Sequence, residues 1–329
     1  MSGRVLVTGG LGFIGSAFVR ALAADGRRVL NVDLHTYAGD PRRIADAGEL
    51  VETVTLDVAD PDLEALVGDE RPPLVVHFAA ESHVTRSEDA AETFFHANVE
   101  GTRRVLDAAV VAGVPRVLHM STDEVYGPCT GPPFGEADKP PGEGLATSAY
   151  ARSKALADDL ARAYADRLDV VVARPTNCIG PWQHPEKAVP RWATRALRGE
   201  RLPVWGDGRQ VRDWMFVDDA VSALRLLAER GERGEAYNIG PAAEGVPNVD
   251  IARLIAQAAA GDPELVYLSE YDRPQHDRRY AVDTRRLAAL GWAPSRTLEQ
   301  AVVETVEWYR ANRAWWELLV GEAEALYAD

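Results

Sequence analysis

Two pairs of residues in the sequence have the types and the spacing for proton transfer. Tyr150 and Lys154 are four residues apart in a helical pattern, so both side chains fall on one face of the helix. A lysine ammonium there would lower the pKa of the phenol from its reference value of about 10 and create a base for a substrate hydroxyl. Asp123 and Glu124 are adjacent. Crowding and burial would leave one of them a protonated acid and the other an ionised base.

Each pair also has an ordinary structural interpretation. A Tyr/Lys pair at this spacing is common on a solvated helix surface, and two acidic residues can mark a polar change from strand to loop. The acidic pair, however, follows Ser121 and Thr122 at the end of the apolar stretch 114–120, and the Tyr150 helix comes next. Ligands of open α/β sheets bind at the carboxyl edge of the strands, so this position favours catalytic roles.

The elements that would hold these residues alternate along the first half of the chain. Short β-branched stretches alternate with helical patterns, which indicates βαβ units on a parallel sheet. The expected strands are 4–8, 28–33, 51–56, 74–78, 114–120 and 170–173, with a later one at 235–239. The expected helices are 13–24, 92–112, 148–166, 218–230 and 248–260. The predicted fold is α/β, a Rossmann-type doubly wound parallel sheet with a smaller mixed α/β lobe.

A glycine motif joins the first expected strand to the first expected helix. Gly9 permits a tight turn, Gly12 lets the backbone approach a pyrophosphate, and Gly15 allows close packing of the helix. The N-terminus of the helix, at Phe13 and Ile14, favours an anion. A glycine pattern alone is weak evidence, but this one has the strand-turn-helix context that a dinucleotide site requires.

Asp33 ends the second expected strand, about 20 residues beyond the glycines. A carboxylate at this point hydrogen-bonds the adenosine ribose hydroxyls and repels a 2′-phosphate, and the following Leu34 and His35 supply no arginine. The sequence therefore predicts NAD and not NADP. Asp57 and Val58 close the third strand and could flank the adenine, although a surface aspartate at a strand end is an equally good interpretation.

The glycine motif, Ser121 or Thr122, Tyr150 and Lys154 together resemble the extended short-chain dehydrogenase/reductase family. Within that family the chain resembles the dTDP-glucose 4,6-dehydratases over nearly its whole length. Epimerases and reductases share the glycine motif, whereas the Thr-Asp-Glu triplet at 122–124 is specific to 4,6-dehydratases. The further matching strings are Ala-Ala-Glu-Ser-His-Val at 79–84, the whole of 121–127, Gly-Pro-Trp-Gln-His-Pro-Glu-Lys at 180–187, Arg-Asp-Trp at 212–214 and Asp-Arg-Pro-Gln-His-Asp-Arg-Arg-Tyr at 272–280.

The resemblance implies an enzyme that converts dTDP-glucose to dTDP-4-keto-6-deoxyglucose. Tyr150, helped by Lys154 and Thr122, would take the proton of the C4 hydroxyl while hydride leaves C4 for NAD. Glu124 would then remove the C5 proton, and protonated Asp123 would deliver a proton to the departing C6 hydroxyl. Hydride returns to C6 and a proton to C5, so the cofactor ends the cycle as it began.

The same resemblance implies the binding residues. Arg212 and Arg273 suit bidentate phosphate contacts and Trp205 suits stacking on the base, although each could singly be a core or ion-pairing residue. The expected NAD-binding residues are Gly9, Gly12, Phe13, Ile14, Gly15, Asp33, Asp57, Val58, Ala79, Ala80, Ser82, Tyr150 and Lys154. The expected substrate-binding residues are Ser82, His83, Asn177, Lys187, Pro203, Trp205, Arg212, Asn248, Arg273 and His276. No metal site is expected.

The chain departs from the family pattern at four positions. Thr85 stands where aspartate is usual, Ala149 replaces the proline before the tyrosine, and Cys178 and Ile179 replace an Asn-Tyr pair. None of these changes removes a proposed proton-transfer group. They fall on the sugar side of the expected cleft, so the preferred base and hexose stay open.

Two other functions fit parts of the pattern. An NAD-dependent nucleotide-sugar C4 epimerase or a UDP-glucuronate decarboxylase would use Thr122, Tyr150 and Lys154 without the Asp123/Glu124 pair. A non-catalytic dinucleotide-binding regulator would need no proton transfer. Such proteins often lose the tyrosine or the lysine, and both are present here.

Composition restricts the partners and the location. A formal charge of −15 over 329 residues argues against a nucleic-acid surface, and no apolar stretch approaches the roughly 20 residues of a membrane helix. The start of the chain carries no secretory signal, so we expect a cytoplasmic protein. Its two cysteines, Cys129 and Cys178, are expected to be reduced and structural.

Domain organisation follows from the change of pattern near Gly180, after which the strict alternation breaks. We expect an NAD-binding domain over 1–180 and a mainly nucleotide-sugar-binding lobe over 181–329, with segments near 205–240 returning to the first domain. By the family resemblance, the helices 92–112 and 148–166 should pair two subunits as a four-helix bundle, which makes the protein a homodimer.

Overall fold

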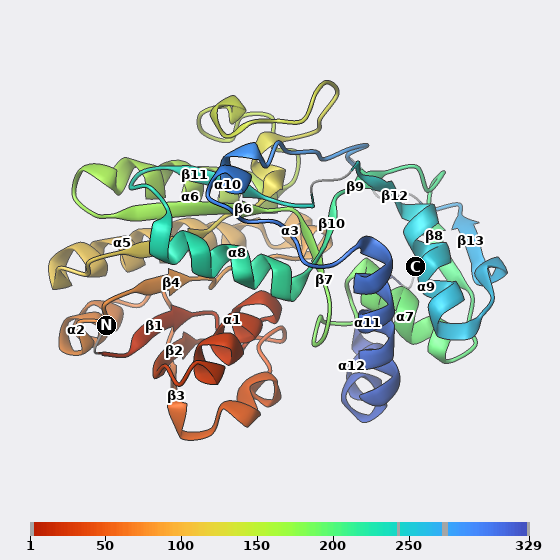
Figure 1. The fold of residues 1–329 in the computed structure, drawn as a ribbon, viewed down its shortest axis with the longest axis horizontal. Helices are drawn as coiled ribbons and strands as arrows, with labels where there is room; N and C mark the ends of the chain where they lie inside the picture. Colours follow the sequence, from red (N-terminus) through yellow and green to blue (C-terminus); the bar gives the residue numbers. More distant parts are fainter. Residues whose placement is uncertain (1–2, 242–243, 272–275, 328–329) are drawn as a thin grey trace.

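A seven-stranded parallel sheet is the centre of the fold in the computed structural model, which describes residues 3–241, 244–271 and 276–327 (Figure 1). The strand order is β11-β6-β5-β4-β1-β2-β3, and every pairing is parallel. The strands are β1 (Val5–Thr8), β2 (Val29–Asp33), β3 (Val51–Thr55), β4 (Val75–His77), β5 (Val117–Met120), β6 (Val170–Pro175) and β11 (Ala236–Ile239). The predicted doubly wound α/β class is confirmed.

Helices cover both faces of the sheet, which explains why its inner strands are largely apolar, while the edge strand β3 is mostly polar. Along β1, Val5 and Val7 point to one face and Leu6 to the other. The first face is covered by α1 (Phe13–Ala24) and α8 (Val217–Arg230). The opposite face is covered by α2 (Asp62–Glu70), α5 (Gly101–Ala112) and α6 (Ala149–Ala163).

The helix expected over 92–112 contains a break in its regular hydrogen bonding. It begins as α4 (Ala91–Phe95), passes through one π-helical segment, η2 (His96–Glu100), and continues as α5. A π turn inserts an extra residue into the helix and is often found at functional sites. The segment lies beside the cofactor cavity described below.

The second lobe packs four helices around three two-stranded sheets. Its core brings together Trp192, Phe216, Tyr309, Trp315 and Trp316. The helices are α7 (Ala188–Leu197), α9 (Asn248–Ala260), α11 (Leu298–Ala311) and α12 (Arg313–Ala325). The strand pairs are β7 (Asn177–Ile179) with β10 (Trp214–Phe216), β8 (Leu202–Trp205) with β13 (Val266–Ser269), and β9 (Val211–Arg212) with β12 (Val246–Pro247).

The chain crosses between the lobes more than once. After β10 it returns to pack α8 against α1, and β11 adds to the large sheet beside β6. A division into domains near residue 180 stays a prediction. The short helices are α3 (Val84–Asp89), α10 (Arg285–Ala289), η1 (Pro41–Leu50), η3 (Asp123–Tyr126), η4 (Glu136–Asp138), η5 (Tyr164–Asp166) and η6 (Pro263–Leu265).

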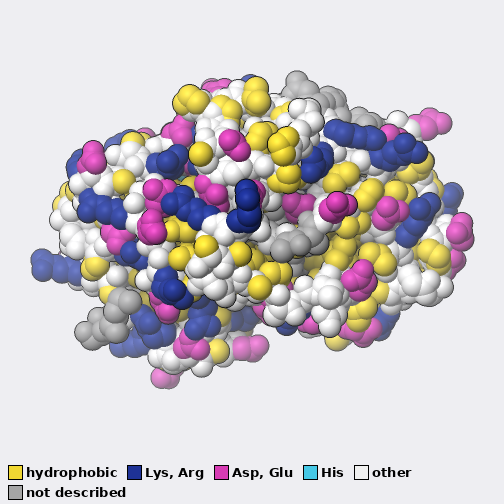
Figure 2. All heavy atoms as spheres, turned by 45° about the horizontal axis from the view of Figure 1, so that its top comes forward, with side chains coloured by type: hydrophobic (Ala, Val, Ile, Leu, Met, Phe, Trp, Pro, Cys, Tyr) yellow, Lys and Arg dark blue, Asp and Glu magenta, His cyan; other side chains and the backbone are white. Residues whose placement is uncertain are grey.

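The cysteines, the charged surface and the helices can be compared with what the composition indicated. Cys129 and Cys178 are both buried and free of disulfides. Figure 2 shows basic and acidic side chains interspersed over the face in view. In the part of the chain that the structure describes, none of the helices combines the length and apolarity needed to cross a membrane.

Candidate active site

A cavity of about 390 Å³ opens at the carboxyl ends of the central strands. The strand order reverses between β1 and β4, and this switch point is where doubly wound sheets bind ligands. Its lining includes every residue predicted to bind the cofactor and all five predicted catalytic residues: Gly9, Gly12, Phe13, Ile14, Gly15, Asp33, Asp57, Val58, Ala79, Ala80, Ser82, Thr122, Asp123, Glu124, Tyr150 and Lys154.

The glycine turn has the geometry that a dinucleotide pyrophosphate needs. Gly9 has φ +74°, and a Cβ there would lie 2.5 Å from the backbone nitrogen of Ala79. A Cβ on Gly15 would lie 2.2 Å from the carbonyl oxygen of Gly9. Gly12 is the N-cap of α1 and brings no side chain to its first N–H groups. The backbone therefore presents free donors and a helix N-terminus to an anion, as the motif predicts.

Asp33 and Arg43 meet at the adenosine end of this cavity. Asp33 accepts hydrogen bonds from the backbone nitrogens of Leu11, at 2.9 Å, and His35, at 3.0 Å. Arg43 comes from η1 and was not predicted. Its guanidinium donates to the carbonyl oxygens of Leu11, at 2.6 Å, and Trp182, at 3.0 Å. Arg43 therefore joins the segments around Leu11 and Trp182, and the selection against a 2′-phosphate by Asp33 stays a prediction.

Asp123 is a buried carboxyl with a strongly shifted pKa. Burial raises the pKa to about 8, and the neighbouring Glu124 and Asp213 act in the same direction. The hydroxyl of Thr122 donates to Asp123 Oδ1 at 3.2 Å, whereas Oδ2 has no hydrogen-bond partner among the described residues. At neutral pH this carboxyl is therefore mostly protonated, and one of its oxygens is available to a ligand in the cavity.

The backbone after β5 places both acidic residues in the same cavity. The strand ends at Met120, and η3 begins at Asp123 with Thr122 as its N-cap. The backbone nitrogen of Glu124 donates to the Thr122 hydroxyl at 3.3 Å. Because the strand has ended, the alternation of an extended chain no longer sends the two side chains to opposite faces. The arrangement places a protonated acid next to a second carboxyl.

The expectation of a lowered tyrosine pKa is wrong for this site as it stands. Burial raises the pKa of Tyr150 well above its usual value, and Glu124 adds to the effect, while a hydrogen bond with Thr122 opposes it. Lys154 is itself buried, and burial lowers its pKa to about 8. Its ammonium donates to the carbonyl oxygen of Met120 at 2.6 Å. In these buried surroundings desolvation outweighs the attraction that sequence spacing suggested.

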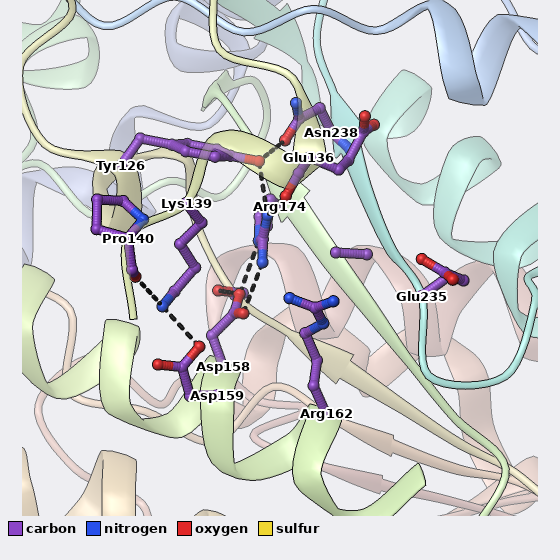
Figure 3. A network of polar contacts seen from close by, with 12 residues as sticks. Tyr126, Glu136, Lys139, Pro140, Asp158, Asp159, Arg162, Arg174, Glu235 and Asn238 are labelled. Carbon is purple, nitrogen blue, oxygen red and sulfur yellow. Dashed lines mark hydrogen bonds and ion pairs between the residues drawn. The ribbon is translucent and has the colours of Figure 1, made fainter. Parts of the chain in front are cut away.

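A buried network of hydrogen bonds and ion pairs holds α6, the helix that carries Tyr150 and Lys154 (Figure 3). Asp158, one turn after Lys154, receives two hydrogen bonds from Arg174, at 2.8 and 2.7 Å, and one from the hydroxyl of Ser121, at 2.7 Å. Arg174 and Asp158 are both 0% exposed. Asp158 also raises the pKa of Lys154, against the effect of burial. The network ties α6 to β5 and β6 and so fixes the lysine beneath the site.

Arg174 extends the network on the side away from Asp158. It donates to the hydroxyl of Tyr126 at 2.7 Å, and Tyr126 in turn donates to Asn238 Oδ1 at 2.6 Å. Figure 3 shows these residues converging from η3, β6 and β11. The turn that carries Asp123 and Glu124 is therefore anchored at its far end, at Tyr126.

A second cavity, of about 200 Å³, adjoins the first through Ser82, Glu124, Asn177, Glu186 and Lys187, which line both. All the described residues predicted to bind substrate line it: Ser82, His83, Asn177, Lys187, Pro203, Trp205, Arg212, Asn248 and His276. The predicted phosphate ligand Arg273 lies outside the described residues.

Buried polar atoms in the second cavity favour a ligand site. The side-chain oxygens of Asn177 and Asn248 and the indole nitrogen of Trp214 have no hydrogen-bond partner among the described residues. Buried polar atoms are nearly always paired in folded proteins, so such a group suggests a missing partner. Arg212 is held over the Tyr280 ring, 4.3 Å from its centroid, and donates to the carbonyl oxygen of Asp277 at 2.9 Å. The cavity thus combines cationic and amide groups, as a phosphorylated ligand requires.

Comparison with known proteins now settles the family. Residues 5–240 match the model of the NAD dependent epimerase/dehydratase family. The chain belongs to this family. The match covers the glycine turn, the acidic pair and the Tyr150 helix, and it is consistent with the predicted NAD cofactor.

Individual relatives of this chain confirm the resemblance that its sequence motifs indicated. A dTDP-glucose 4,6-dehydratase of Streptomyces niveus is 40% identical over 98% of this chain and 97% of its own. A low-salt glycan biosynthesis protein of Haloferax volcanii is 42% identical over 93% of this chain and 98% of its own. The solved structure of a dTDP-glucose 4,6-dehydratase from Streptomyces venezuelae with NAD bound has a TM-score of 0.88 at 40% identity, covering 96% of this chain and 99% of that chain.

The fold alone does not separate the reactions within the family. A UDP-glucose 4-epimerase of Thermotoga maritima gives a TM-score of 0.87 at 28% identity, covering 94% of this chain and 99% of that chain. This value is almost the same as that of the dehydratase structure. The distinction must come from side chains in the cavity, above all from the acidic pair.

Several residues in and beside the site were not predicted from the sequence. Asn98, on the π segment, bonds both backbone groups of Glu81, at 2.9 and 3.0 Å, and the hydroxyl of Ser153, at 2.8 Å. Glu186 is 2% exposed and lines both cavities. Tyr327 lines the second cavity. These contacts join segments that are far apart in the chain. Only Glu186 carried a signal, as a member of the family string at 180–187.

Proposed function

We propose that this protein is a nucleotide-sugar 4,6-dehydratase that acts on dTDP-glucose with NAD as its cofactor. The observation that carries the proposal is the acidic pair: Asp123 is buried with a pKa of about 8, and Glu124 lies beside it in the cavity that also holds Tyr150. An elimination of water across two neighbouring carbons needs an acid for the departing hydroxyl and a base for the carbon-bound proton. The pair supplies both.

Oxidation at C4 would use Tyr150, Thr122 and Lys154. The phenolic oxygen is hydrogen-bonded to Thr122 and, as phenolate, would accept the C4 hydroxyl proton, while the Lys154 ammonium holds the end of β5 in place. Gly12, Asp33 and Lys154 are among the residues that would hold NAD in this cavity, and the bound cofactor would supply a hydride acceptor for C4 and a hydride donor for C6. Its positively charged nicotinamide ring would favour the phenolate and so act against the burial that raises the pKa of Tyr150.

Elimination would follow from the acidity that a C4 ketone gives to the C5 hydrogen. Glu124 would take the C5 proton, and Asp123 would donate its proton to the C6 oxygen, so that the C6–O bond breaks and water leaves. Oδ2 of Asp123 is the oxygen without a partner among the described residues, which suits it to this transfer. Hydride delivery to C6 and a proton to C5 complete the 4-keto-6-deoxy sugar.

The relatives support the reaction, and the acidic pair favours it over the alternatives. A C4 epimerase or UDP-glucuronate decarboxylase has no step that needs the pair. A dinucleotide-binding regulator would not need Tyr150 and Lys154, which both line the cavity. The dTDP-glucose 4,6-dehydratases among the relatives suggest the same nucleotide for this chain.

A panel of substrates tests the proposal. The purified protein is incubated with dTDP-, UDP-, CDP- and GDP-glucose, and the products are identified by NMR. We expect dTDP-glucose to be converted to the 4-keto-6-deoxy product with no net change of NAD. Formation of the galactose epimer without loss of water would refute the dehydratase and identify an epimerase.

Two further parts of the proposal concern the assembly. We expect a homodimer that pairs the helices at 91–112 and α6 with their copies, and a cytoplasmic location. Leu156 on α6 and Phe95 and Val99 on the facing helices are half-buried apolar side chains outside the core clusters. Pairing with a second subunit would remove this apolar surface from water.

A further inference from the structure

Tyr327, just beyond α12, is part of the wall of the second cavity. Its ring meets the ring of Trp205 edge-on, with 5.3 Å between the centroids. The guanidinium of Arg191 lies over the same ring, 4.1 Å from its centroid. The Tyr327 hydroxyl donates to the carbonyl oxygen of Glu186 at 2.5 Å, and it lies 3.2 Å from Nε2 of His83. Contacts with three separate segments, at His83, 186–191 and Trp205, fix the position of this tyrosine.

The helix α12, which precedes Tyr327, is bound to the second lobe and to the cofactor-binding side of the molecule. Glu324 pairs with Arg191 at 2.7 Å and with Arg195 at 3.2 Å, and both arginines belong to α7 of the second lobe. Nearer its start, the indole of Trp315 donates to Asp40 at 2.6 Å, next to η1 of the cofactor side. Such anchoring keeps the Tyr327 ring in one place and reduces the entropy lost when a ligand packs against it.

The cavity wall around Tyr327 has the chemistry of a nucleoside diphosphate site. Trp205 and Tyr327 supply two aromatic rings, and Arg191, Arg212 and Lys187 supply positive charge. Aromatic side chains stack on bases, and guanidinium groups match phosphate oxygens. Of the proton-transfer groups, Tyr150 and Asp123 line the first cavity alone, and Glu124 lies where the two cavities adjoin. A residue in this position would act on binding and not on the chemical steps.

We infer that Tyr327 is a binding residue for the nucleotide part of the substrate. It would pack its ring against the nucleoside and hold Arg191 toward the diphosphate. The inference rests on the proposed function for the class of substrate. It predicts that Tyr327 contributes to KM and to the affinity for free dTDP, and that it leaves kcat almost unchanged.

The test compares Tyr327→Ala and Tyr327→Phe with the wild type. The affinity for dTDP is measured by calorimetry, and kcat and KM are measured with dTDP-glucose. Loss of the ring should weaken dTDP binding and raise KM about 5- to 10-fold, the effect of one aromatic contact. Phenylalanine keeps the ring, so Tyr327→Phe should stay within about 3-fold of the wild type, as expected for loss of one hydrogen bond. NAD affinity should not change in either variant.

Controls separate this effect from a loss of structure. Leu318→Ala changes an exposed residue on the same helix and should leave KM and dTDP affinity unchanged. Thermal unfolding of each variant shows whether α12 stays docked. Unchanged dTDP affinity in a folded Tyr327→Ala protein would overturn the inference, as would a fall in kcat at constant KM. A wild type that binds dTDP tightly but dehydrates no sugar would refute the proposed function alone, and one that does not bind dTDP would refute both.

Discussion

Burial acts on the acid and on the lysine of this site in opposite directions. It raises the pKa of Asp123 to about 8 and lowers that of Lys154 to about 8, because each group loses water that would stabilise its charged form. The identities of these residues could be predicted from the Thr-Asp-Glu triplet and the Tyr/Lys spacing. A raised pKa in the acidic pair was also predicted, whereas the lowered pKa of Lys154 and the raised pKa of Tyr150 were not, because burial depends on the walls that distant segments build around them.

The shifted acid should make stability depend on pH. Folded Asp123 keeps its proton up to about pH 8, whereas the ordinary carboxyl value is 3.8, so the native state loses stability as pH rises between these values. Asparagine cannot ionise, so Asp123→Asn should be more stable than the wild type at pH 8, with each pKa unit worth about 1.4 kcal/mol. Urea unfolding at pH 4.5, 6 and 8 measures the difference. A gain that does not grow with pH would contradict the assigned shift.

At the scale of elements, the strands and the glycine turn could be predicted well because local patterns specify them. The predicted strand 28–33 and helix 13–24 correspond to β2 and α1. The π segment η2 depends on bonds from Asn98 to Glu81 and Ser153, which are 17 and 55 residues away along the chain. Contacts of this length leave no local pattern. The Arg174–Asp158 ion pair could not be predicted either, because the two residues are 16 apart in sequence.

The buried ion pair should be costly to break. Asp158→Asn leaves the guanidinium of Arg174 buried with one charged partner removed, and such changes destabilise proteins by about 3–5 kcal/mol. Asp250→Asn breaks an exposed pair with Arg253 and should cost less than about 1 kcal/mol. Chemical denaturation of both variants gives the comparison. Equal losses of stability would show that the buried network does not support α6 as described.

The glycine turn offers a second test at this scale. Gly15→Ala would place a methyl group 2.2 Å from the Gly9 carbonyl oxygen, so the turn must open and NAD affinity should fall at least about 10-fold, since a 1.4 kcal/mol loss is tenfold. Gly68, inside α2, has open space around its missing Cβ, and Gly68→Ala should stabilise the helix by up to about 1 kcal/mol without changing NAD binding. Calorimetric titration with NAD distinguishes them. Retained affinity in Gly15→Ala would argue against the assigned pyrophosphate site.

At the scale of the molecule, two lobes build one continuous site. Ser82, Asn177 and Lys187 line both cavities, and the proposed function puts the nucleotide in the second cavity and the sugar beside the acidic pair in the first. The two-lobe plan could be anticipated from the change of pattern near Gly180. The role of α12 could not, because its contacts with Asp40 and Arg191 join the last part of the chain to segments far before it.

The predicted homodimer can also be tested at the scale of the whole molecule. Leu156→Glu would put a charge among the half-buried apolar residues of α6 and should convert the dimer to monomers. Leu318→Glu introduces the same charge at an exposed position on α12 and should leave the dimer intact. Sedimentation analysis of both variants measures the assembly. A wild type that sediments as a monomer would rule out the proposed pairing.

The central claim is that Glu124 and Asp123 carry out an elimination that follows oxidation by Tyr150. It is tested most directly by mixing Glu124→Gln protein loaded with NAD with dTDP-glucose in a single turnover. We expect the absorbance of reduced nicotinamide to appear and persist, with no loss of water and no exchange of the C5 proton with solvent. Glu64→Gln, at an exposed position on α2, should behave as the wild type. Turnover of Glu124→Gln to the 4-keto-6-deoxy product at the wild-type rate would contradict the claim.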